Sequence, residues 1–248
     1  MVQLYDGERI DYLTADESMQ IIQSNTAFSF SLDAVLLAHF AYVPIQRGRI
    51  LDLCTGNGAI PLLLSKRTRA SIVGVEIQER IVDMAKRSVQ LNQLGDRLTM
   101  IHGNLKHMQH ELGQSTFDVV TCNPPYFRHS RQEEHNHNTY LTIARHEVAC
   151  TLEDVVKACK LYVRPGGKVA MVHRPNRLVD ILTLFRKYAI EPKRIQYVYP
   201  KHGRDANMLL VEGIRDGKSD CTVLPPFYVY NGDGTYTREA EDVINGNK

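Results

Sequence analysis

The sequence predicts an open α/β fold, a seven-stranded, mostly parallel sheet with an antiparallel last strand and helices on both faces. Short apolar runs rich in β-branched residues alternate with amphipathic segments over most of the 248 residues, which is typical of such a sheet. The last two apolar runs are joined only by residues 200–207. This loop is too short for a crossover helix, so we expect those two strands to form an antiparallel pair at one edge.

Each expected element follows from its local pattern. The expected strands are residues 49–54, 71–76, 98–102, 117–122, 168–173, 194–199 and 208–212. The expected helices are residues 31–41, 59–67, 78–94, 105–112, 152–163 and 177–188. The pattern is clearest in 78–94, where Ile81, Met84, Ala85, Ser88 and Leu91 share one helix face. The residues Pro165, Gly166 and Gly167 are expected to close the helix at 152–163.

Composition limits the class of protein. With 43% hydrophobic and 23% charged residues the chain is typical of a globular protein and not of a disordered one. Apolar runs stay well below the ~18 residues of a membrane span, and no basic stretch leads into an apolar core at the N-terminus. The five cysteines include no CxxC pair, which argues against a disulfide framework or a zinc site. We therefore expect a cytoplasmic protein, with no membrane or metal partner.

The chain divides into three expected parts. Residues 1–45 form an N-terminal extension and a helix packed on the core, and residues 46–215 form the α/β core. Residues 216–248 form a C-terminal hairpin or tail, because Asn231-Gly232-Asp233-Gly234 is a hairpin signal between two aromatic segments.

A glycine turn follows the first expected strand. Gly56 and Gly58 allow the backbone to approach a ligand, and Glu76 ends the next strand, where it is placed to bind ribose hydroxyls. Pro61 replaces the third glycine of a dinucleotide fingerprint. Asp52 beside the turn would repel a pyrophosphate but suits the positive sulfonium and amino groups of S-adenosylmethionine. The turn therefore favours S-adenosylmethionine over NAD, the alternative being an ordinary tight turn.

Asn104 follows the third expected strand, at the same edge of the sheet. Its side-chain oxygen can accept a hydrogen bond from the adenine amine of such a cofactor, and it can also cap the helix expected from residue 105.

A stiff polar loop follows the fourth expected strand. In Asn123-Pro124-Pro125-Tyr126 the prolines fix the backbone and leave the Asn123 side-chain oxygen and the Pro124 carbonyl as acceptors. Two such acceptors suit a planar NH2 group, and the ring of Tyr126 offers a face for stacking a flat base or amide. This geometry favours methyl transfer to an sp2 amine, catalysed by positioning rather than by a strong base.

Positive charge is concentrated in one part of the chain. Residues 121–215 hold 16 Lys and Arg against 9 Asp and Glu, a net charge of +7. This excess favours a polyanionic partner, although a solvated surface would explain it as well. The candidate RNA contacts are Arg128, Arg131, Arg145, Arg174, Arg177, Lys201 and Arg204. The histidines of residues 128–146 are interpreted as part of a polar substrate loop rather than as metal ligands.

Together these motifs resemble the S-adenosylmethionine-dependent amino methyltransferases with an NPPY loop. Segments 28–38, 144–147, 173–178, 198–201 and 206–212 are similar to the bacterial valine-tRNA adenine-N6 methyltransferase family. The resemblance covers about residues 1–230, with Ser31 where family members commonly have glycine. It implies a Rossmann-like class I methyltransferase that modifies the adenine beside the anticodon of a valine tRNA, and we expect this enzyme to be a monomer.

The resemblance also implies residue roles. Asn123, Pro124 and Tyr126 would form the amine and base pocket, and Gly56, Gly58, Glu76 and Asn104 would hold S-adenosylmethionine, with S-adenosylhomocysteine as product. Three alternatives stay open at this stage. The same loop serves glutamine-N5 protein methyltransferases and guanine-N2 RNA methyltransferases, and a non-catalytic RNA-binding module would keep the fold.

Overall fold

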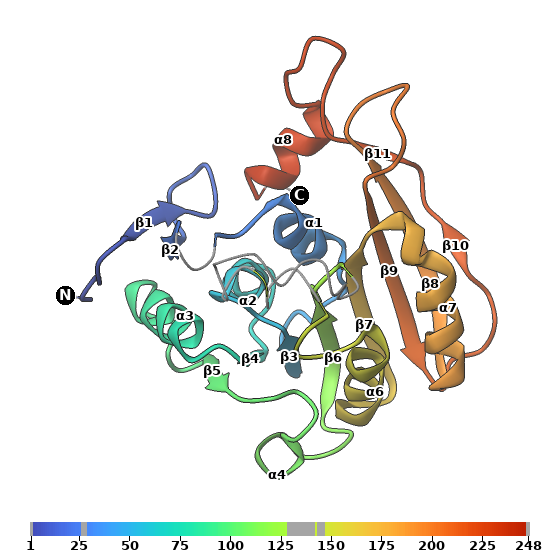
Figure 1. The fold of residues 1–248 in the computed structure, drawn as a ribbon, viewed down its shortest axis with the longest axis horizontal. Helices are drawn as coiled ribbons and strands as arrows, with labels where there is room; N and C mark the ends of the chain where they lie inside the picture. The colour runs from blue at the N-terminus through green and yellow to red at the C-terminus, as the bar shows by residue number, and fades with distance from the viewer. Residues whose placement is uncertain (1, 26–28, 128–141, 143–146, 247–248) are drawn as a thin grey trace.

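The computed structural model describes residues 2–25, 29–127, 142 and 147–246 (Figure 1). Its centre is a nine-stranded sheet in the order β10-β8-β9-β7-β6-β3-β4-β5, with β11 also paired to β8. These strands are β3 (Arg49–Leu53), β4 (Ser71–Glu76), β5 (Leu98–His102), β6 (Phe117–Cys122), β7 (Val163–His173), β8 (Ile190–Tyr199), β9 (Met208–Arg215), β10 (Thr222–Val223) and β11 (Phe227–Tyr228). Only β9 runs antiparallel to its neighbours β7 and β8, as its sequence position predicts.

Helices cover both faces of the sheet (Figure 1). One face packs on α1 (Leu32–Phe40), α2 (Ala59–Ser65), α3 (Glu79–Leu91) and α8 (Arg238–Ile244). The other packs on α4 (Gln109–Leu112), α6 (Leu152–Tyr162) and α7 (Leu178–Lys187), which follows the 3-10 turn η2 (Pro175–Arg177). Strand alternation separates the two cores, since Ile50 belongs to the first core and Leu51 to the second. In the described residues, no helix is both long and apolar enough to span a membrane.

The predicted open α/β fold is confirmed, with two differences at its edges. The antiparallel pair is not at the edge, because the short strands β10 and β11 add to β8. Strand β7 begins at Val163 instead of residue 168, so Pro165, Gly166 and Gly167 lie within the strand. Phe117 pairs with Val163 and Val119 with Lys168, so residues 164–167 form an irregularity between two paired positions, where Gly166 adopts a φ of 72°.

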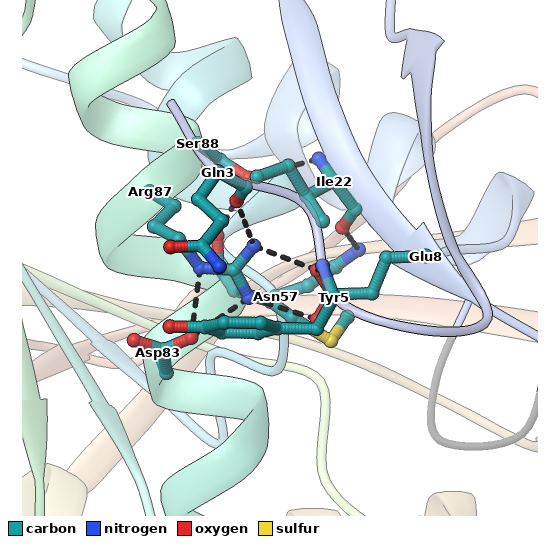
Figure 2. A network of polar contacts seen from close by, with 9 residues as sticks. Gln3, Tyr5, Glu8, Ile22, Asn57, Asp83, Arg87 and Ser88 are labelled. Carbon is teal, nitrogen blue, oxygen red and sulfur yellow. Dashed lines mark hydrogen bonds and ion pairs between the residues drawn. The ribbon is translucent and has the colours of Figure 1, made fainter. Parts of the chain in front are cut away.

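A two-stranded hairpin, β1 (Glu8–Tyr12) and β2 (Gln20–Ser24), lies beside the sheet and was not predicted. Figure 2 shows how it docks on α3 through polar groups. Arg87 of α3 donates to both carboxylate oxygens of Glu8, at 2.6 and 2.8 Å, and lies 4.4 Å from the ring of Tyr5. The backbone N–H of Ile22 donates to the Ser88 hydroxyl at 2.9 Å. The N-terminal segment is therefore anchored to α3, the helix that follows β4.

The C-terminal part differs from a plain hairpin. A turn is present at the Asn231-Gly232-Asp233-Gly234 signal, where Tyr230 and Tyr236 form an antiparallel bridge. However, the segment before the turn joins the main sheet as β11, and the chain ends in α8, which packs near α1. The tail is thus part of the first core, to which Phe227, Ala240 and Val243 contribute buried side chains.

Candidate active site

The strands end in register, which gathers the sequence motifs at one edge of the sheet. Leu53 pairs with both Val75 and Cys122, and Glu76 pairs with His102. The loops after these strands therefore meet, and they line a cavity of about 620 Å³. This volume is within the usual range for a small-molecule site. The cavity is lined by Gly56, Glu76, Asn104, Asn123, Pro124 and Tyr126, all predicted as site residues.

The glycine turn has the backbone that its sequence predicts. Gly56 and Gly58 have φ of 56° and 87°, in the left-handed region that glycine adopts without strain. A Cβ at Gly58 would also meet the Ala85 Cβ of α3 at 3.4 Å, so the turn packs closely on that helix. Cys54 adopts a φ of 56° at the start of the turn, an uncommon conformation for a side chain larger than glycine.

The carboxylate of Glu76 is fixed by three backbone N–H groups, one of which belongs to the glycine turn. It accepts hydrogen bonds from the backbone N–H groups of Gly56 at 3.1 Å, Ile77 at 3.0 Å and Gln78 at 3.1 Å. Burial raises the pKa of this carboxyl, and the three amide donors act in the opposite direction. An acceptor held in this way on the cavity wall is preorganised for a hydroxyl donor such as a ribose diol.

Asp52 does not lie where the sequence prediction placed it. Its side chain is fully buried in β3, outside the cavity lining, and accepts a hydrogen bond from the Thr121 hydroxyl at 2.6 Å. Burial raises its pKa to about 7, which weakens the argument for a fixed negative charge beside the turn. We therefore remove Asp52 from the candidate cofactor contacts, because a residue near a turn in sequence can face the sheet interior instead.

Several other polar residues line the cavity beside Glu76. Asn104 lines it, and its Oδ1 accepts from the backbone N–H of Lys106 at 3.1 Å, the local capping bond expected of this residue. The buried atoms Thr55 Oγ1, Asn57 Oδ1 and Gln78 Oε1 have no hydrogen-bond partner among the residues that the structure describes, and all three residues line the cavity. Buried polar atoms without a partner are costly, so these atoms favour a polar ligand.

The Asn-Pro-Pro-Tyr loop forms another part of the cavity wall. The Tyr126 hydroxyl oxygen lies 2.6 Å from Asn123 Oδ1 and 2.5 Å from Asp33 Oδ2. The Tyr126 ring packs against His173 at 5.1 Å between centroids, and the Arg174 guanidinium lies 5.0 Å from its centre. Burial, followed by the effect of Asp33, raises the pKa of Tyr126 well above its usual value, so the phenol is protonated.

Nucleophilic chemistry at Cys122 is not supported. The thiol is fully buried at the end of β6, and burial raises its pKa to about 12. The neighbouring His173 is also neutral, because burial, followed by Arg177 and Arg174, lowers its pKa to about 3. Cys122 and His173 are therefore both uncharged, so neither supplies a nucleophile or a cation to the site.

One wall of the cavity was missed by the sequence analysis. It is formed by the segment after β2 and the start of α1, namely Ser24, Asn25, Ser29, Phe30, Ser31, Asp33 and Ala34. The Asn57 side-chain amide donates to the Ile22 carbonyl at 3.1 Å, which ties this segment to the glycine turn (Figure 2). The only sequence signal was the resemblance of residues 28–38 to a methyltransferase family, which assigns no role to individual residues.

The predicted RNA contacts have different environments. Arg174 lines the cavity, whereas Lys201 and Arg204 lie in the loop after β8, which ends at the same sheet edge as β7. The structure contradicts the prediction that Arg177 contacts RNA, because this side chain is buried and pairs with Glu147 at 2.6 Å and Asp180 at 2.8 Å. Such a structural ion pair leaves no free cation for a phosphate. The predicted Arg128, Arg131 and Arg145, with most of the histidine-rich segment, lie outside the described residues.

Comparison with known families agrees with this geometry. The model of the methyltransferase small domain matches residues 19–193. The chain belongs to this methyltransferase family. Curated relatives include the tRNA1(Val) (adenine(37)-N6)-methyltransferases of Porphyromonas gingivalis, 26% identical over 79% of this chain and 78% of the relative, and of Aeromonas hydrophila, 26% identical over 85% and 86%.

Solved structures share the fold of this methyltransferase. One is a predicted O-methyltransferase from Agrobacterium tumefaciens, with a TM-score of 0.69 and 22% identity over 86% of this chain and 96% of that one. Another is geranyl diphosphate C-methyltransferase from Streptomyces coelicolor, with a TM-score of 0.55 and 11% identity over 74% and 77%, in complex with S-adenosyl-L-homocysteine. At these identities the likeness shows the fold alone.

Proposed function

We propose that this methyltransferase transfers a methyl group from S-adenosylmethionine to the exocyclic N6 amine of an adenine in tRNA, beside the anticodon of a valine tRNA. The observation that carries the proposal is the shared cavity, which is lined by the loop at Asn123 as well as by Gly56 and Glu76. The names of the curated relatives support the substrate. We expect a monomeric enzyme of the cytoplasm.

The cavity suits S-adenosylmethionine. Glu76 would accept hydrogen bonds from the ribose hydroxyls, Asn104 would contact the adenine, and Gly56 would let the backbone approach the ligand, while Gly58, which is not among the lining residues, would shape the turn. The unpartnered oxygen of Gln78 gives the wall a further acceptor. When bound, this cofactor supplies an electrophilic methyl group.

The Asn-Pro-Pro-Tyr loop would hold the accepting amine. Asn123 Oδ1 and the Pro124 carbonyl would accept its two hydrogens, which directs the nitrogen lone pair toward the methyl carbon. The nitrogen forms the new N–C bond as the S–C bond breaks, and the bonding pair stays on sulfur. The amine then loses one proton to solvent. The adenine must leave its stack to reach this loop, which is least costly in a tRNA loop.

The proposal is tested by tritiated methyl transfer to total tRNA, total protein and DNA in parallel. We expect label in tRNA, as N6-methyladenosine after digestion. Label only in protein would favour a glutamine-N5 methyltransferase, and label in guanosine a guanine-N2 enzyme. A catalytically inactive protein that binds tRNA would favour the RNA-binding module. Each of these three results contradicts the proposal.

Asn123→Ala gives a second test. Losing one oriented acceptor should lower kcat about 10²–10³-fold, while the affinity for S-adenosylhomocysteine changes little. Asn231→Ala in the C-terminal turn, which lies outside the cavity lining, is the matched control and should keep wild-type kcat. An Asn123→Ala enzyme with wild-type kcat would show that the loop does not hold the reacting amine.

A further inference from the structure

The Tyr126 hydroxyl lies between two side chains from distant parts of the chain. Asp33 Oδ2, in the first turn of α1, is 2.5 Å from it, and Asn123 Oδ1 is 2.6 Å from it. All three residues line the cavity. The Tyr126 ring is held by His173 and Arg174, so the hydroxyl has a fixed place.

This arrangement has fewer protons than acceptors. The Tyr126 hydroxyl carries one proton, whereas both facing atoms, Asp33 Oδ2 and Asn123 Oδ1, are acceptors. A carboxylate only accepts, and a charged acceptor is the stronger one, so the phenol donates to Asp33. The lone pair that remains on the phenol oxygen then needs a donor from Asn123. A half-turn of the Asn123 amide about χ2 places Nδ2 there, since Oδ1 and Nδ2 exchange positions.

We infer that Asp33 is a positioning residue that orients the Asn123 amide through the Tyr126 hydroxyl. With Nδ2 donating to the phenol, Asn123 Oδ1 turns into the cavity, where a substrate amine needs an acceptor. This inference rests on the proposed function, because only an amine substrate uses that oxygen. It also gives the Tyr126 hydroxyl a role beyond the stacking expected from the sequence.

The position of Asp33 has a second consequence. Positive charge moves from sulfur to the amine nitrogen during methyl transfer, and Asp33 lies on the wall of the same cavity, one phenol away from Asn123. A carboxylate there favours the positive charge where it develops. Replacing Asp33 by asparagine removes this charge and leaves a neutral amide acceptor, so the phenol proton no longer prefers residue 33 over Asn123.

The kinetic test uses Asp33→Asn, Tyr126→Phe and the double variant. Each single change should lower kcat about tenfold or more, while the KM for S-adenosylmethionine stays within about twofold. The double variant should be no worse than the poorer single variant, because the residues act as one chain. The control is Asp96→Asn, an exposed carboxylate between α3 and β5 at the opposite sheet edge, which should keep wild-type kcat.

A second measurement needs no substrate. The side-chain NH2 signals of Asn123, assigned in the NMR spectrum by their loss in Asn123→Ser, should exchange slowly with solvent in the wild type. In Asp33→Asn and in Tyr126→Phe this exchange should be about tenfold faster or more. Unchanged exchange, or an Asp33→Asn enzyme with wild-type kcat on tRNA, overturns the inference. A wild type that fails to methylate tRNA but shows the protected amide contradicts the proposed function and leaves the orientation of Asn123 supported.

Discussion

At the level of single residues, Glu76 is the sharpest test of the cofactor site. Its carboxylate is held by three backbone N–H groups, so truncation removes a ribose acceptor and leaves those donors unpaired. Glu76→Ala should weaken S-adenosylhomocysteine binding about tenfold or more in calorimetry, the scale of a charge-assisted hydrogen bond. Glu79→Ala, an exposed carboxylate at the start of α3, is the matched control. Equal affinities for both variants would contradict ribose binding by Glu76.

Asp52 makes the stability of the protein depend on pH. Burial raises its pKa from 3.8 to about 7, so between these values the folded state keeps a proton that the unfolded state has lost. The free energy of unfolding should therefore fall as pH rises through this window, by up to about 4 kcal/mol. Thermal unfolding of Asp52→Asn should lack this part of the decrease, whereas Asp96→Asn should keep it. The same pH dependence in Asp52→Asn and the wild type would contradict the raised pKa.

At the level of elements, the β1–β2 hairpin depends on Arg87 (Figure 2). The Glu8 side chain is 0% exposed, so Arg87→Ala leaves its carboxylate buried without its cation. We expect a loss of about 3 kcal/mol in urea unfolding. Hydrogen exchange should quicken in β1 and β2 while β7 is unchanged. The Glu8→Ala/Arg87→Ala double variant should lose less free energy of unfolding than the sum of the two single variants. Strictly additive losses would contradict an energetic coupling between Glu8 and Arg87.

The elements that sequence predicts well are those with their own periodicity. The amphipathic pattern of α3 and the apolar runs of β3, β4 and β6 can be recognised from the local sequence alone. The hairpin does not, because its anchors are polar contacts between residues as distant as Glu8 and Arg87. The strands β10 and β11 have two residues each, which is too few for any period. Such elements form only when an existing strand supplies their partners.

For the whole molecule, the sequence predicts the site wherever strand order decides it. Glu76 ends β4, and Asn104 and Asn123 follow the parallel strands β5 and β6, so one edge of the sheet gathers them. The sequence analysis did not identify Asp33 as a site residue, because α1 comes before the first strand of the main sheet. Only folding of the chain brings Asp33 to Tyr126. The prediction of Arg177 as an RNA contact failed for a related reason, since its carboxylate partner Glu147 lies 30 residues away in the sequence.

The charge of the whole molecule is also redistributed by folding. Much of the basic excess of residues 121–215 is paired in the structure, as for Lys160 with Asp216, Arg164 with Asp118 and Arg194 with Glu212. Paired cations contribute less to binding a polyanion, because their charge is already balanced. The loop 200–207 stays as a described candidate for RNA contact, and Arg174 links it to the cavity by donating to the Asn207 carbonyl at 2.8 Å.

Salt dependence separates these two kinds of cation. Lys201→Ala/Arg204→Ala should reduce the slope of log K against log salt for tRNA binding by about 1.4–1.8, because each phosphate contact contributes about 0.7–0.9. The matched control is Arg186→Ala/Lys187→Ala, two cations of α7 that pair with Glu191 and Glu153. This control should keep the wild-type slope in a filter-binding titration. Equal slopes for the two double variants would show that the loop after β8 does not contact the phosphates, and that tRNA is held by other parts of the chain.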